Sequence, residues 1–160
     1  MSTFPAKILV ATDGSEDSDL AVQAAVDLSN ETGAELHVVH VGESLHVYPP
    51  PASGPPSSTP SSEEIRQVAQ RMLDAQVEQV GKRGGKVEET HLQLGRPAEE
   101  ILHVSEEIVA GLIVVGNQGL SGRFSRMRRF LMGGVSESVT RYARCSVMVV
   151  RKDLYDRPST

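Results

Sequence analysis

The regular alternation of short apolar runs with helical patterns is the feature that most constrains this fold. Five runs of five to nine residues are too short to be buried helices, and glycine or polar residues lie at their ends. The stretches between them carry apolar residues at helical spacing. This alternation predicts one open, doubly wound sheet of five parallel strands with helices on both faces. The expected strands are residues 7–11, 35–41, 86–94, 112–116 and 146–150.

Helix signals fill the intervals between these runs. Ser15 can cap a first helix that stops at Gly33, and a proline in the first turn opens a helix at Pro97. A long amphipathic helix should close near residues 81–85, and a last one should lie near residues 134–143. We expect one domain over residues 1–152, a Pro/Ser-rich surface loop at 48–62, an extended Arg-rich loop at 120–132 and a tail at 153–160.

Composition narrows the class of protein. The net charge of −5 removes the broad basic surface expected of a nucleic-acid-binding protein, so we expect no nucleic-acid partner. A lone cysteine, Cys145, excludes an intramolecular disulfide and fits a reducing cytosol. The first ten residues lack the apolar core of a signal peptide or membrane span. We therefore expect a soluble cytoplasmic protein with no membrane partner.

The two segments that follow the first and fourth strands are the candidate binding region. In doubly wound sheets, ligands bind outside the carboxyl ends of strands where the strand order reverses, which points to 11–15 and 116–134. Glycines at 116, 119, 133 and 134 leave backbone amides near a helix start accessible to phosphate oxygens. The helix start after the first strand carries Glu16, Asp17 and Asp19, which repel phosphate. Asp13 is better suited to a ribose hydroxyl, although glycines also serve as simple turns.

Several ordered motifs together resemble the universal stress protein family. They cover nearly the whole chain, as residues 8–15 (ILVATDGS), 36–41 (LHVVHV), 95–101 (GRPAEEI), 114–122 (VVGNQGLSG), 133–139 (GGVSESV) and 145–150 (CSVMVV). The resemblance implies a Rossmann-like sheet of the adenine nucleotide alpha hydrolase type with strand order 3-2-1-4-5. It also implies an adenine nucleotide as ligand, ATP first, with ADP, AMP or cyclic AMP as alternatives.

The resemblance assigns roles to individual residues. Asp13 would hold ribose, the Val41 backbone would meet adenine, Ala11 would border the base, and Gly116 and Gly119 would line the phosphates. Gly133 with Ser136 would receive those phosphates, and Mg²⁺ would bind through them rather than through protein side chains. The full candidate set is Ala11, Thr12, Asp13, Val41, Gly116, Asn117, Gly119, Gly133, Gly134, Val135 and Ser136.

This chain departs from the pattern of ATP-binding members at the phosphate end. Thirteen residues, 120–132, separate Gly119 from Gly133, and Gly134 stands where a hydroxyl residue is usual. The longer loop carries arginines that could clamp phosphates or, alternatively, form a solvated docking surface for an acidic partner. They are Arg123, Arg126, Arg128 and Arg129.

The histidines show no spacing typical of a metal site. His37 and His40 lie in one strand with side chains on opposite faces, which argues against joint metal binding. We therefore expect no metal held by protein side chains.

Three functional hypotheses remain open at this stage. The first is a nucleotide-binding stress-response regulator that acts through its conformation or an unknown protein partner. The second is an interaction protein of the same fold that no longer binds nucleotide, and the third is a slow ATPase. We expect no catalytic residues. An apolar edge strand at 146–150 predicts a homodimer, which the family resemblance also implies.

Overall fold

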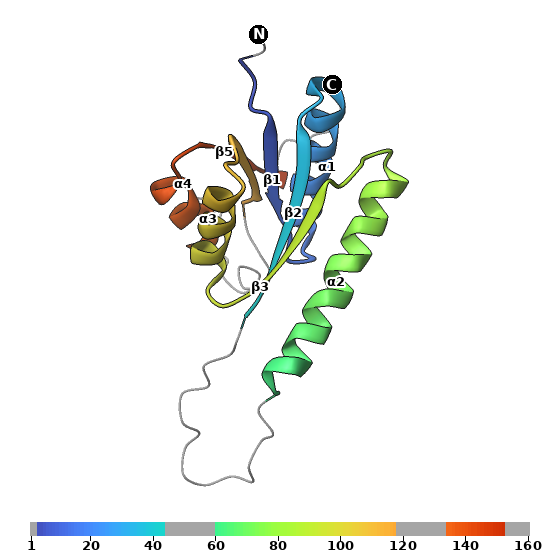
Figure 1. Cartoon of the computed structure of the whole chain (residues 1–160), viewed down its shortest axis with the longest axis vertical. Coiled ribbons are helices and arrows are strands. Elements are labelled where there is room, and N and C mark those ends of the chain that lie inside the picture. Colours follow the sequence, from blue (N-terminus) through green and yellow to red (C-terminus); the bar gives the residue numbers. More distant parts are fainter. Residues whose placement is uncertain (1–2, 44–59, 118–133, 153–160) are drawn as a thin grey trace, which may run out of the picture.

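The computed structural model describes residues 3–43, 60–117 and 134–152. Strands and helices alternate along these segments, as the sequence predicts (Figure 1). In chain order they are β1 (Lys7–Ala11), α1 (Glu16–Thr32), β2 (Glu35–Gly42), α2 (Ser62–Lys82), β3 (Glu89–Leu94), α3 (Pro97–Glu107), β4 (Leu112–Gly116), α4 (Gly134–Tyr142) and β5 (Ser146–Val150).

The five strands form one parallel sheet in the order β3-β2-β1-β4-β5, which confirms the expected architecture. β1 lies at the centre, where Leu9 is level with His37 of β2 and with Ile113 of β4. The chain runs outward from β1 to β3 on one side, then crosses to β4 and β5 on the other. The strand order thus reverses between β1 and β4, which makes the carboxyl ends of these two strands the topological switch point.

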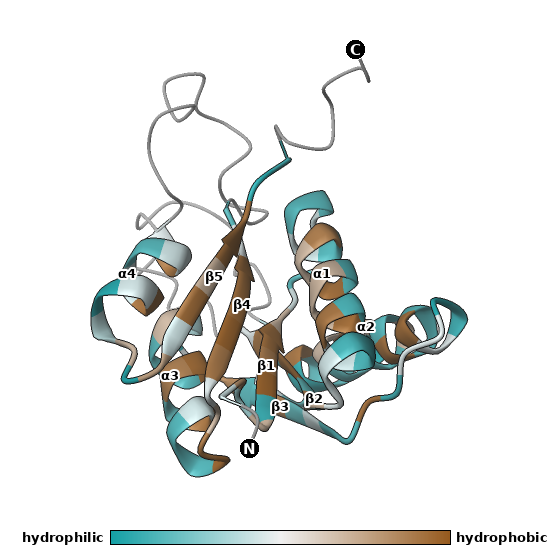
Figure 2. Cartoon of the chain, turned by 90° about the horizontal axis from the view of Figure 1, so that it is seen from above, coloured by the Kyte–Doolittle hydropathy of each residue, from teal (hydrophilic) through white to brown (hydrophobic). Residues whose placement is uncertain are grey.

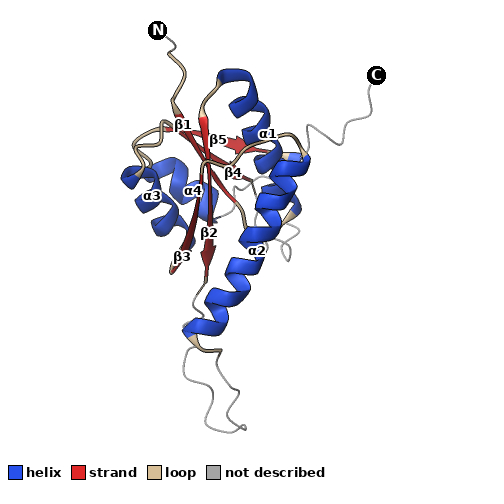
Figure 3. Cartoon of the chain, turned by 45° about the vertical axis from the view of Figure 1, so that its right-hand side comes forward, coloured by secondary structure: helices blue, strands red, loops and turns tan. Residues whose placement is uncertain are grey.

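Alternate residues of the strands build two cores, one on each face of the sheet. Ile8 and Val10 face a cluster that α1 and α2 complete, whereas Leu9 and Ile113 face a second cluster under α3 and α4. Figure 3 shows the helices on the two faces, and Figure 2 shows that β1 and β4 are apolar along most of their length. This period of two explains why continuous apolar runs predict these strands.

Local capping fixes the helix ends. Ser15 accepts the Ser18 N–H at 3.2 Å at the start of α1, and Gly33 ends that helix with φ of 75°. At α2, Ser61 and Glu64 form a capping box, in which each side chain accepts the backbone N–H of the other residue. α2 therefore begins at Ser62, the last residue of the expected loop. The remainder of the loop at 48–59 lies outside the described residues.

The outer strands differ from the expectation of strands buried on both faces. β3 begins at Glu89 rather than at residue 86, and its first two residues are exposed. In β5, exposed and half-buried residues alternate from Ser146 to Val149, and Val150 is buried. Met148 is 37% exposed. Both strands lie at sheet edges, where one side lacks a neighbouring strand. Among the described residues, no helix combines the length and apolarity needed to cross a membrane.

Candidate functional site

A cleft with a volume of about 800 Å³ opens at the switch point. Its size falls within the usual range for small-molecule sites, roughly 300–1,000 Å³. Nine predicted residues line it, from the ends of β1, β2 and β4 and the start of α4. They are Ala11, Thr12, Asp13, Val41, Gly116, Asn117, Gly134, Val135 and Ser136.

The other predicted residues belong to the longer glycine loop. Gly119 and Gly133 lie outside the described residues, as do the possible phosphate clamps. Those clamps are Arg123, Arg126, Arg128 and Arg129.

A hydrogen-bonded turn shapes the exit from β1. Asp13 Oδ1 accepts the Ser15 N–H at 2.9 Å, which directs the carboxylate toward the start of α1. Ser18 Oγ donates to the Ser15 carbonyl at 3.0 Å and lies 3.4 Å from Thr12 Oγ1. Short hydroxyl side chains therefore hold the turn in place, and Asp13 stays partly accessible within the cleft.

His40 anchors the same turn from β2. Its Nδ1–H donates to the Thr12 carbonyl at 2.7 Å, and the side chain lines the cleft. Burial lowers the pKa of His40, while the Thr12 hydrogen bond and the Asp13 charge oppose this shift. A histidine therefore contributes to this site although the sequence analysis did not select it, and only its place in a strand that ends at the cleft could have indicated it.

Acidification should weaken the fold in part through His40. Its ordinary pKa is 6.5 and its folded pKa is lower, so the unfolded chain binds the proton more tightly. The stability contributed by the neutral ring is complete above pH 6.5 and is lost as the pH falls toward the folded pKa. His40→Gln should therefore lose less stability than the wild type between about pH 7.5 and about pH 5.5 in urea denaturation.

His103→Gln is the control for the exchange of histidine for glutamine, because His103 is exposed on α3. It should lose more stability than His40→Gln over the same pH interval. His91 also has a pKa lowered first by burial, so His40→Gln reduces the loss without abolishing it. Equal losses of stability in the wild type and His40→Gln would contradict the proposed contribution of His40 to the pH dependence.

The backbone of Val41 faces the cleft because of the strand register. Successive residues of a parallel strand direct their N–H and C=O groups to alternate neighbours. The Val39 carbonyl accepts the Thr12 N–H, while the Gly42 carbonyl accepts the Gly95 N–H next to β3. Val41 therefore points its backbone groups to the β1 side. β1 ends at Ala11, level with Val39, so these groups lie beyond its last residue.

The start of α4 is joined to the end of β4. Ser136 Oγ donates to the Asn117 carbonyl at 3.1 Å, and the Asn117 N–H donates to the Val150 carbonyl at 3.0 Å. The hydroxyl proton of Ser136 is therefore engaged with Asn117. Asn117 Oδ1 is a buried side-chain oxygen that lacks a hydrogen-bond partner within the part of the chain that the structure describes.

Gly116 permits a close approach of α1 to the end of β4. A Cβ at this position would lie 2.7 Å from the backbone carbon and oxygen of Asp17. Gly134 is different, because a Cβ there would meet no atom of the described residues within 4 Å. The first glycine is therefore required for packing, whereas the second leaves open space at the α4 start.

One wall of the cleft comes from α2, which the sequence analysis did not assign to the site. Ile65, Val68, Ala69 and Met72 line the cleft, and Val68 is 59% exposed. Their helical spacing predicts a buried face, but the spacing does not show that this face extends past the end of the sheet. The signal that could have identified them is the length of α2, which exceeds that of the strands it covers.

The fold and the cleft define a doubly wound α/β protein with a ligand-sized site at its switch point. The model of the universal stress protein family matches residues 6–151, and the chain belongs to this family. Universal stress protein YxiE of Bacillus subtilis is 34% identical over 150 residues, which cover 91% of this chain and 98% of that protein.

Solved structures share this fold. A universal stress protein in complex with cAMP superposes with a TM-score of 0.67 at 22% identity, covering 91% of this chain and 97% of that one. The universal stress protein of Archaeoglobus fulgidus in complex with dAMP gives a TM-score of 0.63 at 24% identity, covering 90% and 96%. At these identities the likeness concerns the fold.

Proposed function

We propose that this chain is an adenine-nucleotide-binding regulator of the stress response, with ATP as its first ligand and the cytoplasm as its location. The observation that carries the proposal is the cleft itself. Residues from four separate segments, predicted as nucleotide ligands, line one space of suitable size. The complexes of related folds with cAMP and dAMP support an adenine nucleotide as the ligand class.

The base would occupy the apolar end of the cleft. Val41 offers one N–H donor and one C=O acceptor on the β1 side, which matches the donor and acceptor pattern of the adenine edge. Val115, Ile101 and Ala69 provide apolar surface around this position. Backbone recognition of this kind selects the base without a charged side chain.

The ribose and phosphates would extend toward β1 and α4. Asp13 is the acceptor for ribose hydroxyls, and the positive N-terminal end of α4, which lines the cleft at Gly134 and Val135, would attract the phosphate oxygens. Glu16, Asp17 and Asp19 make the α1 start unfavourable for phosphate. A hydrogen-bond donor group of the nucleotide beside Asn117 Oδ1 would give this buried acceptor a partner. Leaving such an acceptor unpaired costs about 1–3 kcal/mol.

Regulation fits this cleft better than fast catalysis. Three carboxylates line the cleft among the described residues. The proposed ribose contact uses Asp13, Glu64 caps α2, and Glu43 is exposed beyond the end of β2. We therefore assign at most slow ATP hydrolysis to the chain. The competing proposal, an interaction protein without nucleotide, has support in the departures from the family pattern at Gly134 and in the longer loop.

Calorimetry with ATP, ADP, AMP and cyclic AMP tests the proposal. We expect saturable heat with at least ATP, and mass spectrometry of ligand released from freshly purified protein should recover an adenine nucleotide. No heat beyond dilution with any of the four nucleotides would reject the function.

Asp13→Ala should abolish any slow phosphate release from ATP. Equal rates in the wild type and the variant would assign the activity to contamination.

We also propose a homodimer through β5. Val147 and Val149 are half-buried and Met148 is 37% exposed on this edge strand, which leaves apolar surface. Within the part of the chain that the structure describes, no strand pairs with the outer side of β5. Pairing with a second copy would cover the apolar surface and this outer side. Light scattering should give a particle of twice the 17.3 kDa chain mass, and a 17.3 kDa particle at micromolar concentration would contradict the dimer.

A further inference from the structure

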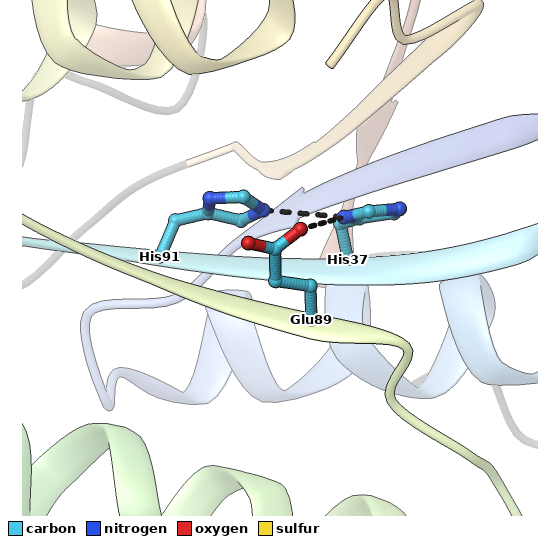
Figure 4. Close-up of side chains that lie close together, drawn as sticks. All are labelled: His37, Glu89 and His91. Atoms are coloured by element: carbon cyan, nitrogen blue, oxygen red, sulfur yellow. Dashed lines mark hydrogen bonds and ion pairs between the residues drawn. The ribbon is translucent and has the colours of Figure 1, made fainter. Parts of the chain in front are cut away.

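We propose that His37, Glu89 and His91 form a binding site for a divalent transition metal of the Zn²⁺ class, which joins β2 to the edge strand β3. Strand register brings them together, because His37 is level with Glu89 and Val39 is level with His91. The three side chains therefore share one face of the sheet. Figure 4 shows both imidazole rings and the carboxylate converging on one point.

The distances fit a metal centre. His37 Nδ1 and His91 Nε2 lie 3.2 Å apart. Two nitrogens bound at about 2.0–2.1 Å to a tetrahedral zinc are separated by roughly 3.3 Å. Glu89 Oε2 lies 4.0 Å from His37 Nδ1, and one donor atom from each residue lies within 4.8 Å of the others. Glu89 is exposed, so its carboxylate can move the remaining distance by rotation of its side chain.

A second carboxylate, that of Glu35, orients the buried histidine. Glu35 Oε2 lies 3.4 Å from His37 Nε2, and Lys7 lies 4.0 Å from the same oxygen. Metal-binding histidines commonly donate their second ring N–H to a carboxylate, which fixes the tautomer. With Nε2–H directed to Glu35, the lone pair of Nδ1 is directed to His91 and Glu89. This arrangement is an observation independent of the three donor atoms.

The ligand chemistry selects the metal class. Two neutral imidazoles and one carboxylate suit zinc and its first-row neighbours, whereas Mg²⁺ and Ca²⁺ prefer oxygen ligands. His37 is 3% exposed, His91 is half-buried and Glu89 is exposed, so the site opens outward at the sheet edge. Water would complete the coordination there. The alternative to a metal is a simple hydrogen bond between the two rings.

This site is separate from the proposed nucleotide cleft. His37 lies four residues before Val41 along β2, which corresponds to about 13 Å. None of its three residues lines the cleft. Zinc binding therefore does not require nucleotide, and the two proposals can fail independently.

Titration of Zn²⁺ into the chelator-treated, tag-free full chain, without nucleotide, tests the inference. Calorimetry should give one Zn²⁺ per chain, and thermal unfolding should shift to higher temperature, since the ligand binds the folded state. Mg²⁺ should give neither effect. His91→Gln and Glu89→Gln should each weaken Zn²⁺ binding by more than about tenfold. Co²⁺ should give visible ligand-field bands that His91→Gln abolishes.

Glu88→Gln is the matched control, because Glu88 is adjacent to Glu89 in the chain but pairs with Lys86. It should bind Zn²⁺ as the wild type does. Circular dichroism establishes that each variant is folded, and Asp13→Asn, which changes the cleft alone, should retain Zn²⁺ binding. Absence of Zn²⁺ binding to the wild type, or equal affinity in the wild type and His91→Gln, overturns the proposal and leaves a hydrogen bond between the rings.

Discussion

Asp13→Asn should weaken ATP binding by about 10- to 100-fold, the equivalent of roughly 1.5–3 kcal/mol for a hydrogen bond to a charged group. Asparagine retains an Oδ1 acceptor for the Ser15 N–H, which Asp13 holds at 2.9 Å, so the turn before α1 is preserved. What it lacks is the carboxylate charge offered to the ribose hydroxyls. Calorimetry with ATP at fixed salt measures the change in dissociation constant.

Glu43→Gln is the control for the loss of one negative charge. Glu43 is exposed and lines the same cleft beyond the end of β2, but it has no proposed contact with ribose. Its replacement should alter the dissociation constant by less than about threefold, as expected of an exposed charge. If Asp13→Asn binds ATP as tightly as Glu43→Gln does, the ribose assignment is wrong.

Gly116→Ala should destabilise the protein by about 3 kcal/mol, near the upper end of the usual cost of overpacking. The new Cβ would lie 2.7 Å from the backbone carbon and oxygen of Asp17, and backbone in the first turn of α1 cannot move aside as a flexible side chain can. Relief of this contact requires α1 to separate from β4. Urea denaturation measures the change in the free energy of unfolding.

Gly134→Ala is the matched substitution at a second glycine that lines the cleft. Space is available there, and alanine favours the helical conformation at the α4 start over glycine by up to about 1 kcal/mol. Its free energy of unfolding should equal or exceed that of the wild type. A similar loss of stability in both variants would show that the approach of Asp17 to Gly116 is not the cause.

The sequence predicts the bounds of four strands to within one residue, but it does not predict those of β3. β1, β4 and β5 have the predicted bounds because short apolar runs end at polar residues or glycine on both sides. β3 is shorter than expected because its ladder with β2 begins at the pair His37 and Glu89. That register depends on pairing between strands separated by more than forty residues, which local patterns do not contain.

The residues of the candidate site also differ in whether the sequence predicts their roles. Asp13 and Gly116 are predictable because the carboxyl ends of parallel strands meet at one edge of the sheet. The roles of His40 and of the α2 wall depend on tertiary packing, as does the contact between His37 and His91. His37 and His40 do face opposite sides of the sheet, as expected. The metal proposal arises from a partner on another strand rather than from the spacing within β2.

The capping box at the start of α2 makes the first residue of the helix independent of the length of the preceding segment. Ser61 and Glu64 satisfy each other's backbone N–H groups, so the first turn is specified by residues of the helix and its immediate flank. A change in the length of the segment before Ser61 would leave this capping pattern intact, so α2 would still begin at Ser62.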